Sequence, residues 1–174
     1  MSIEIYIGPM FAGKTTKLIS MYNENKDSNK VVIDYNKELS INNLINHTTI
    51  KLEKAYKGPY LSLIQEKYKN ILSKKYIYIN ECQFFPDLKT FVLKCLDQNI
   101  NVYLYGLDGD YKQDLFGQTM ELIPYCSYIE KIKGTCQKCT MDSIVSYRTT
   151  NDTEIYLPNN NIYIPLCFKC LKKN

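Results

Sequence analysis

The sequence predicts an α/β protein in which a mainly parallel sheet is flanked by helices and is followed by a small cysteine-bearing region. Three observations indicate this fold. A glycine-rich motif at residues 8–15 lies between an apolar run and a helical pattern, short apolar runs then alternate with amphipathic segments, and two cysteine pairs lie near the C-terminus. At 174 residues, the chain fits one domain with a small appendage.

The composition agrees with this class and excludes others. Hydrophobic residues make up 45% of the chain and charged residues 23%, as expected of a globular protein with a sizeable core. No apolar run is long enough to span a bilayer, and the first residues lack a secretory signal, so we expect a cytoplasmic protein without a membrane partner. A net charge of +4 is too small to indicate nucleic-acid binding by itself.

The glycine-rich stretch matches the phosphate-loop pattern G-x-x-x-x-G-K-S/T. It consists of Gly8, Pro9, Met10, Phe11, Ala12, Gly13, Lys14 and Thr15, and it continues into Thr16. Its backbone N–H groups and the start of the next helix would form a cradle for phosphate. Lys14 would reach the outer phosphates of ATP, and the Thr15 hydroxyl would take a Mg²⁺ position. A glycine-containing turn without a ligand is the alternative.

The first three elements form a β-loop-α-β unit. An apolar run predicts a strand at residues 3–7, and a one-sided apolar pattern predicts a helix over residues 14–25. A second buried strand follows at residues 31–33. Such a crossover connection places both strands parallel in one sheet.

Residues 36–58 carry clusters of polar residues. This composition predicts a mobile excursion with a short hairpin at residues 49–52. The only histidine, His47, lies in the excursion. We expect a solvated loop residue there, because no cysteine or acidic partner lies at motif spacing.

The alternation of helices and strands then continues. Apolar periodicity predicts a helix over residues 59–73, a strand at residues 76–79, a helix around residues 91–96 and a strand at residues 101–105. Residues 106–118 are rich in glycine and aspartate, a composition that suits a lid.

Asn80 and Glu81 directly follow the strand at residues 76–79. Functional side chains in open α/β sheets lie at the carboxyl ends of the strands, so we expect both residues near the phosphate loop. A phosphate loop needs a carboxylate for its Mg²⁺ shell and, where a hydroxyl group is the acceptor, a group that takes its proton. Glu81 is the candidate. The alternative is a surface acidic residue that caps the next element.

The cysteine pairs have the spacing of metal-binding knuckles. A short strand near residues 128–132 leads into them. Two C-x-x-C pairs in a reducing compartment provide four thiolates, which suit a closed, structural Zn²⁺ site. Accidental pairs or redox-active thiols are the alternatives. The pairs are Cys136 with Cys139 and Cys167 with Cys170, and the expected core cysteines are Cys82, Cys95 and Cys126.

In this order, the phosphate loop, the Glu81 segment and the cysteine pairs resemble one family, the cellular and poxvirus-like (type II) thymidine kinases. The resemblance covers nearly the whole chain. Further matching segments lie at residues 31–35, 107–111, 116–117 and 122–124. The resemblance implies a P-loop NTPase-like nucleotide-binding domain over residues 1–132 and a zinc-binding lasso domain over residues 133–174.

The resemblance also implies roles for single residues. Glu81 matches the family's catalytic base, and Phe84 and Tyr111 match its two aromatic contacts to the thymine ring. Arg148 matches a basic residue near the phosphates. Residues 151–163 would form the lasso, with Tyr163 at a nucleoside-binding position. The family forms dimers or tetramers, so we expect a homo-oligomer.

The chain departs from the family pattern at three places. Asn80 replaces the aspartate before the catalytic glutamate, which removes a charge from the outer shell of the metal. The acidic and arginine positions after the second strand fall on Glu38 and Ser40, so one arginine that faces the phosphates is missing. Pro158 and Asn159 replace two glycines of the lasso and restrict its backbone.

We therefore expect a kinase that uses ATP and Mg²⁺ to phosphorylate the 5′-hydroxyl group of thymidine, giving dTMP. The departures at Asn80 and Ser40 leave open a homologue that binds nucleosides or nucleotides with weak or no turnover. A third interpretation is a phosphate-loop ATPase whose zinc region grips nucleic acid. Its support is limited to Lys172, Lys173 and the positive net charge.

Overall fold

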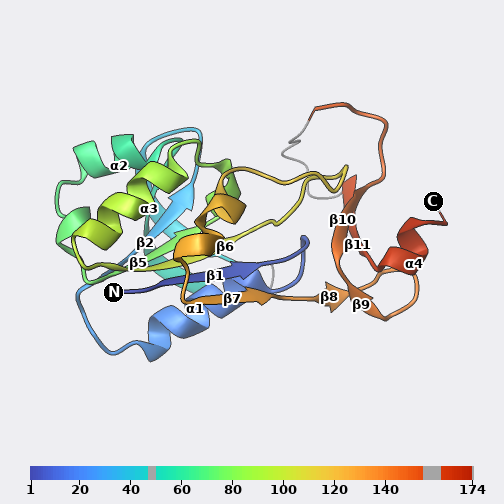
Figure 1. Ribbon diagram of the computed structural model, residues 1–174, viewed down its shortest axis with the longest axis horizontal. Helices are drawn as coiled ribbons and strands as arrows, with labels where there is room; N and C mark the ends of the chain where they lie inside the picture. Colours follow the sequence, from blue (N-terminus) through green and yellow to red (C-terminus); the bar gives the residue numbers. More distant parts are fainter. Residues whose placement is uncertain (47–49, 155–161, 174) are drawn as a thin grey trace.

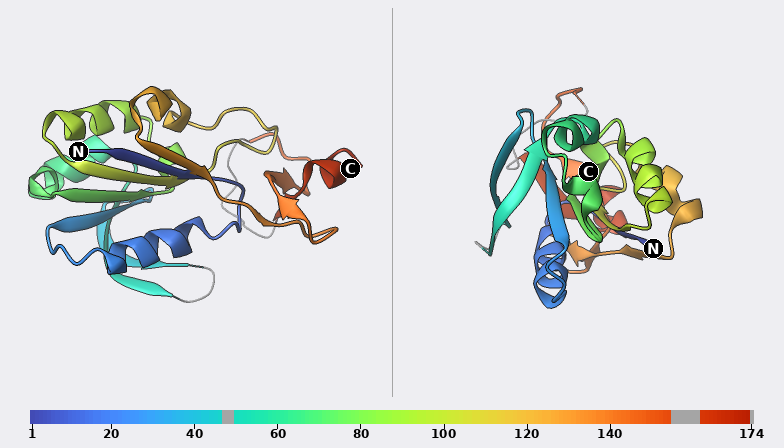
Figure 2. Two further views of the ribbon diagram at one scale, coloured as in Figure 1. Left: turned by 60° about the horizontal axis from the view of Figure 1, so that its bottom comes forward. Right: turned by 90° about the vertical axis from the view of Figure 1, so that its left-hand side faces the viewer.

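The computed structural model describes residues 1–46, 50–154 and 162–173. Its main feature is a seven-stranded sheet with helices on both faces (Figure 1). A smaller part, which contains the C-terminal strands and helix, lies at one end of this sheet (Figure 2). The predicted α/β fold is therefore confirmed.

All but one of the neighbouring strand pairs are parallel. In spatial order the strands are β3 (Ser40–Ile45), β4 (Lys51–Gly58), β2 (Lys30–Tyr35), β5 (Tyr76–Asn80), β6 (Asn101–Gly106), β1 (Ile3–Ile7) and β7 (Tyr128–Lys131). The antiparallel pair is β3 with β4. Parallel strands need crossover connections, which contain α1 (Lys14–Glu24), α2 (Leu61–Lys67) and α3 (Leu88–Asp97). Each strand that the apolar runs predicted is present.

Two apolar cores hold the helices against the two faces of the sheet. Alternate residues of a strand point to opposite faces. On β5, Ile77 and Ile79 therefore lie in the core under α2 and α3, whereas Tyr78 lies in the core under α1 with Leu18 and Ile19. The runs of apolar residues in the central strands follow from this burial on both sides.

The prediction of an excursion over residues 36–58 with only a short hairpin at residues 49–52 was wrong in the extent of the paired strands. Residues 40–45 and 51–58 form β3 and β4, an antiparallel pair that extends the sheet, because β4 pairs in parallel with β2. Leu44, Leu52 and Ala55 are buried, but the register of the hairpin shifts between Asn42 and Leu44, so its burial does not follow a regular period of two that the sequence could reveal. His47 lies outside the described residues.

The helix predicted over residues 59–73 is shorter than expected. The α2 helix ends at Lys67, and a separate 3₁₀ turn, η1 (Ile71–Ser73), follows. Tyr68 leaves the helical conformation, and its ring packs edge-on against Tyr56 with 4.8 Å between the ring centroids. A tertiary contact therefore ends the helix before its apolar pattern ends.

The C-terminal part consists of short elements around the cysteines. They are β8 (Gly134–Thr135), β9 (Asp142–Ser143), β10 (Val145–Arg148), β11 (Tyr163–Leu166) and α4 (Phe168–Leu171). The pairs β8–β9 and β10–β11 are both antiparallel. Two further 3₁₀ segments, η2 (Cys82–Phe84) and η3 (Thr119–Tyr125), belong to the main part. Within the described ranges, no helix combines the length and the apolarity that a membrane crossing needs.

The two sides of the β1–β7 pair predict unequal effects on stability. Ile5 on β1 is fully buried, whereas its register partner Ile129 on β7 is 41% exposed. We predict that Ile5→Ala lowers the free energy of unfolding by about 2–5 kcal/mol, because it leaves a cavity in the core. The control Ile129→Ala should change it by about 0.5 kcal/mol or less. Urea unfolding followed by circular dichroism measures both, and equal losses would contradict the exposed position of β7.

Candidate active site

Most of the predicted site residues converge on one cavity at the carboxyl ends of the parallel strands. The cavity has a volume of about 320 Å³, which is the size of a small-molecule site. Its lining includes the phosphate loop together with Glu81, Phe84, Tyr111 and Tyr163. The sheet edge therefore brings together a phosphate cradle, a carboxylate and aromatic rings.

Two glycines shape the phosphate loop. Gly8 has a φ of 151°, and a Cβ atom there would lie 2.1 Å from the carbonyl oxygen of Ile132, just after β7. Gly13 has a φ of 88°, in the left-handed region, immediately before α1 begins. The loop can thus turn back over the start of α1, where backbone N–H groups and the helix N-terminus favour an anion.

Lys14 lies beneath this loop and is 8% exposed. Its ammonium group donates hydrogen bonds to the carbonyl oxygens of Gly8 at 3.1 Å and Pro9 at 2.7 Å. Burial lowers the pKa of Lys14, and the negative charges of Glu81 and Asp108 oppose this shift. A phosphate group at the loop would offer this cation a charged partner in addition to neutral carbonyl groups.

Glu81 lies directly after β5 in a strained conformation, with φ 50° and ψ 41°. Its carboxylate accepts a hydrogen bond of 2.7 Å from Gln83 Nε2, and Gln83 Oε1 accepts one of 3.0 Å from the N–H group of Leu107. Gly106 leaves room for this arrangement, because a Cβ atom there would lie 2.4 Å from Gln83 Oε1. Gln83 therefore ties the Glu81 carboxylate to the end of β6.

Asn80, the last residue of β5, connects the phosphate loop with β2. Its Oδ1 atom accepts a hydrogen bond of 3.3 Å from the Thr15 hydroxyl, and its Nδ2 atom donates one of 2.9 Å to Asp34. The Asp34 carboxylate also pairs with Lys57 Nζ at 3.0 Å. Thr15 and Asn80 thus bring hard oxygen atoms to the end of the phosphate loop, the ligand type that Mg²⁺ prefers.

Aromatic rings line another part of the cavity. The Phe84 ring lies 5.0 Å from the ring of Tyr35 and 5.2 Å from that of Phe116, centroid to centroid. Phe116 comes from the loop predicted to act as a lid. Planar rings of this kind suit a flat heterocyclic ligand, which they can contact face-on or edge-on.

Arg148 on β10 connects the C-terminal part with the cavity. Its guanidinium carbon lies 3.7 Å from the centroid of the Tyr111 ring, and Nη2 donates a hydrogen bond of 2.6 Å to the Tyr163 hydroxyl. Nη1 donates one of 2.8 Å to the carbonyl oxygen of Asp152. These side chains, predicted from distant parts of the sequence, therefore form one cluster. Of the predicted lasso, residues 155–161, with Pro158 and Asn159, lie outside the described residues.

Several residues of the site were not predicted as such. Asp34 and Tyr35 end β2, so the rule that places functional side chains at strand ends would have found them. Gln83 gave no comparable signal. Ser146, on β10, accepts a hydrogen bond of 2.8 Å from the N–H group of Met10 in the phosphate loop, a contact between segments far apart in the chain.

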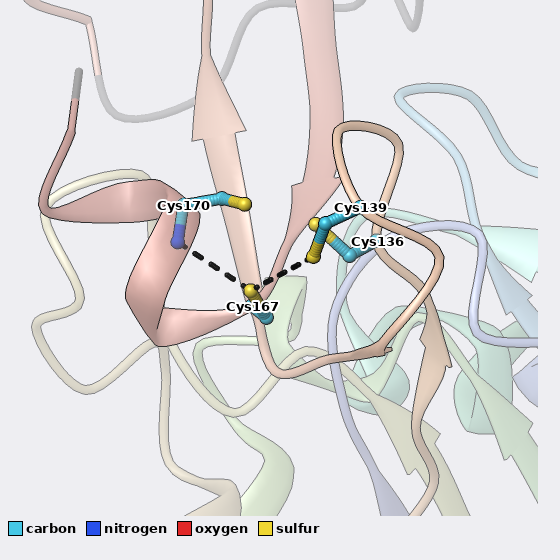
Figure 3. Close-up of side chains that lie close together, drawn as sticks. All are labelled: Cys136, Cys139, Cys167 and Cys170. Atoms are coloured by element: carbon cyan, nitrogen blue, oxygen red, sulfur yellow. Dashed lines mark hydrogen bonds between the residues drawn. The ribbon is translucent and has the colours of Figure 1, made fainter.

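The four predicted cysteine ligands form one cluster (Figure 3). Their sulfur atoms all lie within 4.8 Å of one another. Tetrahedral zinc with Zn–S bonds of about 2.3 Å places sulfur atoms about 3.8 Å apart, so the cluster suits zinc. Burial alone would raise the pKa of Cys136, but hydrogen bonds from backbone N–H groups lower it to about 6 and favour the thiolate. The Cys170 N–H group likewise donates to Cys167 Sγ at 3.4 Å.

The four-cysteine cluster predicts that the protein binds zinc in a fixed ratio to the chain. The purified protein should carry about one equivalent of zinc per chain, measured by plasma mass spectrometry. Cys139→Ser should lower the metal content and the melting temperature, because a thiolate ligand is lost. Cys126, outside the cluster, provides the matched control, and Cys126→Ser should retain the metal. Equal metal loss in both variants would contradict a site built from the four cysteines.

Comparisons with known proteins place the chain in one family. The family model described as thymidine kinase matches residues 1–171. The chain is 33% identical to the thymidine kinase of Amsacta moorei entomopoxvirus, over 98% of this chain and 97% of that protein. It is 31% identical to that of Oryza sativa subsp. japonica, over 95% and 64%, and 30% identical to that of Fowlpox virus (strain NVSL), over 99% and 98%. The chain therefore belongs to the thymidine kinase family, whose members are phosphotransferases.

Proposed function

We propose that the protein transfers the terminal phosphoryl group of ATP to the 5′-hydroxyl group of thymidine and so produces dTMP. Family membership gives the class of reaction. The observation that carries the residue assignments is the single cavity shared by the phosphate loop, Glu81 and the aromatic side chains. Donor, acceptor and base sites would then meet at one edge of the sheet.

The phosphate loop is the donor side of this site. Backbone N–H groups of residues 8–16 and the ammonium group of Lys14 would hold the triphosphate. The Thr15 hydroxyl and Asn80 Oδ1, 3.3 Å apart, fit Mg²⁺ because both are hard oxygen donors beside the loop. When bound there, Mg²⁺ would neutralise charge on the phosphates.

Glu81 is the proposed base on the acceptor side. It would orient the 5′-hydroxyl group in line with the terminal phosphorus atom and accept its proton, while Gln83 holds the carboxylate in place. Orientation carries much of the effect, because the transition state of phosphoryl transfer is loose. Phe84, Tyr111 and Tyr163 line the same cavity and would contact the nucleoside.

We further propose that the chain divides into a nucleotide-binding domain over residues 1–132 and a zinc-binding domain over residues 133–174. A structural Zn²⁺ ion would fix the base of the second domain. The hydrogen bond from the Met10 N–H group to Ser146 supports a role for this domain in holding the phosphate loop. On the resemblance to the family, we propose a dimer or tetramer, which sedimentation velocity would measure.

A kinase assay tests the proposal. Purified protein with ATP, Mg²⁺ and thymidine should form dTMP, and Glu81→Gln should lower kcat by about 10²-fold or more with little change in ATP affinity. Glu66→Gln, an exposed control on α2, should keep the wild-type rate.

Absence of a monophosphate product from every deoxynucleoside would overturn the proposal. Thymidine binding without turnover would instead favour the non-catalytic homologue, which Asn80 and the serine at position 40 motivate. ATP hydrolysis stimulated by DNA would favour the nucleic-acid-dependent ATPase.

The buried position of Lys14 predicts a pH dependence of nucleotide binding. A phosphate favours the protonated side chain, whereas burial in the free protein favours the neutral form. Between the lowered pKa and the ordinary value of 10.5, binding should therefore take up a proton, and the affinity for MgATP should fall as the pH rises. Calorimetry in buffers of different ionisation enthalpy measures the uptake. The Lys14→Met variant should bind MgATP more weakly and without proton uptake. Proton uptake that persists in this variant would belong to another group.

A further inference from the structure

Four side chains from four different elements form a continuous chain of polar contacts next to the phosphate loop, and the two central ones, Asp34 and Asn80, are buried. Lys57 on β4 pairs with Asp34 on β2 at 3.0 Å, and the other carboxylate oxygen of Asp34 accepts a hydrogen bond of 2.9 Å from Asn80 Nδ2. Asn80 Oδ1 in turn accepts the hydrogen bond of 3.3 Å from the Thr15 hydroxyl at the start of α1. Asp34 is 7% exposed and Asn80 5%, so water competes little for these contacts.

The chemistry of the groups fixes the direction of this chain. An ionised carboxylate only accepts hydrogen bonds, whereas an amide offers a donor on one side and an acceptor on the other. Asp34 therefore turns the NH₂ group of Asn80 toward itself, and the carbonyl oxygen of Asn80 toward Thr15. The Thr15 proton then points at Asn80, which leaves the lone pairs of the Thr15 oxygen free for a cation at the phosphate loop.

An asparagine without such a carboxylate could present its NH₂ group to Thr15 instead. Thr15 would then accept a hydrogen bond, and the NH₂ group would lie where a cation needs an oxygen atom. The parallel register pairs Asp34 directly with Asn80, so the carboxylate lies on the neighbouring strand at the same level. Lys57 lowers the cost of burying the Asp34 charge.

We propose that Asp34 is a positioning residue for the magnesium nucleotide, which acts through Asn80 and the Thr15 hydroxyl. This inference rests on the proposed function and adds a residue to the same site. Asp34 would supply, from β2, the negative charge that the family pattern places at the position of Asn80. The loss of that aspartate from β5 is thus compensated by a carboxylate on the adjacent strand.

The test measures Mg²⁺ dependence of nucleotide binding without any phosphoryl transfer. A fluorescent ATP analogue is titrated with Mg²⁺ in the absence of nucleoside, and the half-saturating Mg²⁺ concentration is read. Asp34→Asn should raise this concentration about 10-fold, the usual effect of removing a group that orients a metal ligand. Glu130→Gln breaks a carboxylate–lysine pair at the far edge of the sheet, with Lys17, and should leave the value unchanged.

The Lys57→Gln variant separates a positioning role from a merely structural ion pair. Loss of Lys57 leaves the Asp34 charge without its neutralising partner, so Mg²⁺ should bind at the same or a lower concentration. If Asp34 only ties β2 to β4, Lys57→Gln and Asp34→Asn should have the same effect. Equal effects of these two variants would overturn the proposal.

A double variant provides the rescue and remains informative if Asp34→Asn folds poorly. Asn80→Asp alone places two carboxylates in contact and should weaken folding, as measured by thermal unfolding. Asp34→Asn added to Asn80→Asp should restore both stability and Mg²⁺ dependence, because a carboxylate at position 80 then accepts the Thr15 proton, as the amide oxygen of Asn80 does in the wild type. If Asp34→Asn raises the half-saturating Mg²⁺ concentration both in the wild-type protein and in the Asn80→Asp variant, the proposal is wrong. Because no turnover is measured, failure of the thymidine kinase assay would leave this result interpretable.

Discussion

The parallel pairing of β2, β5, β6 and β1 is the constraint on which the rest of this structure depends. Strands that run in the same direction and pair in register end at one edge of the sheet, so the side chains that follow them meet there. Thr15 and Asn80 are 65 positions apart in sequence, yet they share a hydrogen bond at this edge. The cavity, the phosphate loop and the carboxylate of Glu81 all occupy the same side because of this arrangement.

Close packing at this edge of the sheet leaves no room for side chains at Gly106 and Gly117. Next to them, Glu81 is held in a left-handed backbone conformation. Gly106 and Gly117 lie against Gln83, and a Cβ atom at Gly117 would be 2.2 Å from the Gln83 carbonyl oxygen. Gln83 is thereby fixed, and it holds Glu81. A left-handed conformation of a non-glycine residue costs about 1–3 kcal/mol, which the surrounding contacts must offset. The strain therefore coincides with the proposed catalytic carboxylate.

The C-terminal part has too few apolar residues to form a large core, and its buried cluster consists of Leu166 and three of the four cysteines, Cys136, Cys167 and Cys170. In so small a unit, metal coordination can supply the stability that hydrophobic burial does not. From this base, β11 carries Tyr163 to the cavity, where its hydroxyl accepts a hydrogen bond from Arg148 on β10, and Ser146 contacts the phosphate loop. The cysteine cluster thus lies at the base of strands that carry side chains to the candidate site.

The sequence by itself determined the phosphate loop, the alternating strands and helices, Asn80 and Glu81 at a strand end, and the four-cysteine cluster, because each depends on local periodicity or fixed spacing. For residues 36–58 the sequence predicted only a short hairpin at residues 49–52, whereas β3 and β4 are longer strands, since the parallel pairing of β4 with β2 overrides their polar composition. The roles of Asp34, Gln83 and Ser146 were decided by tertiary structure alone. Their partners are distant in the chain, and no local pattern encodes which strands become neighbours.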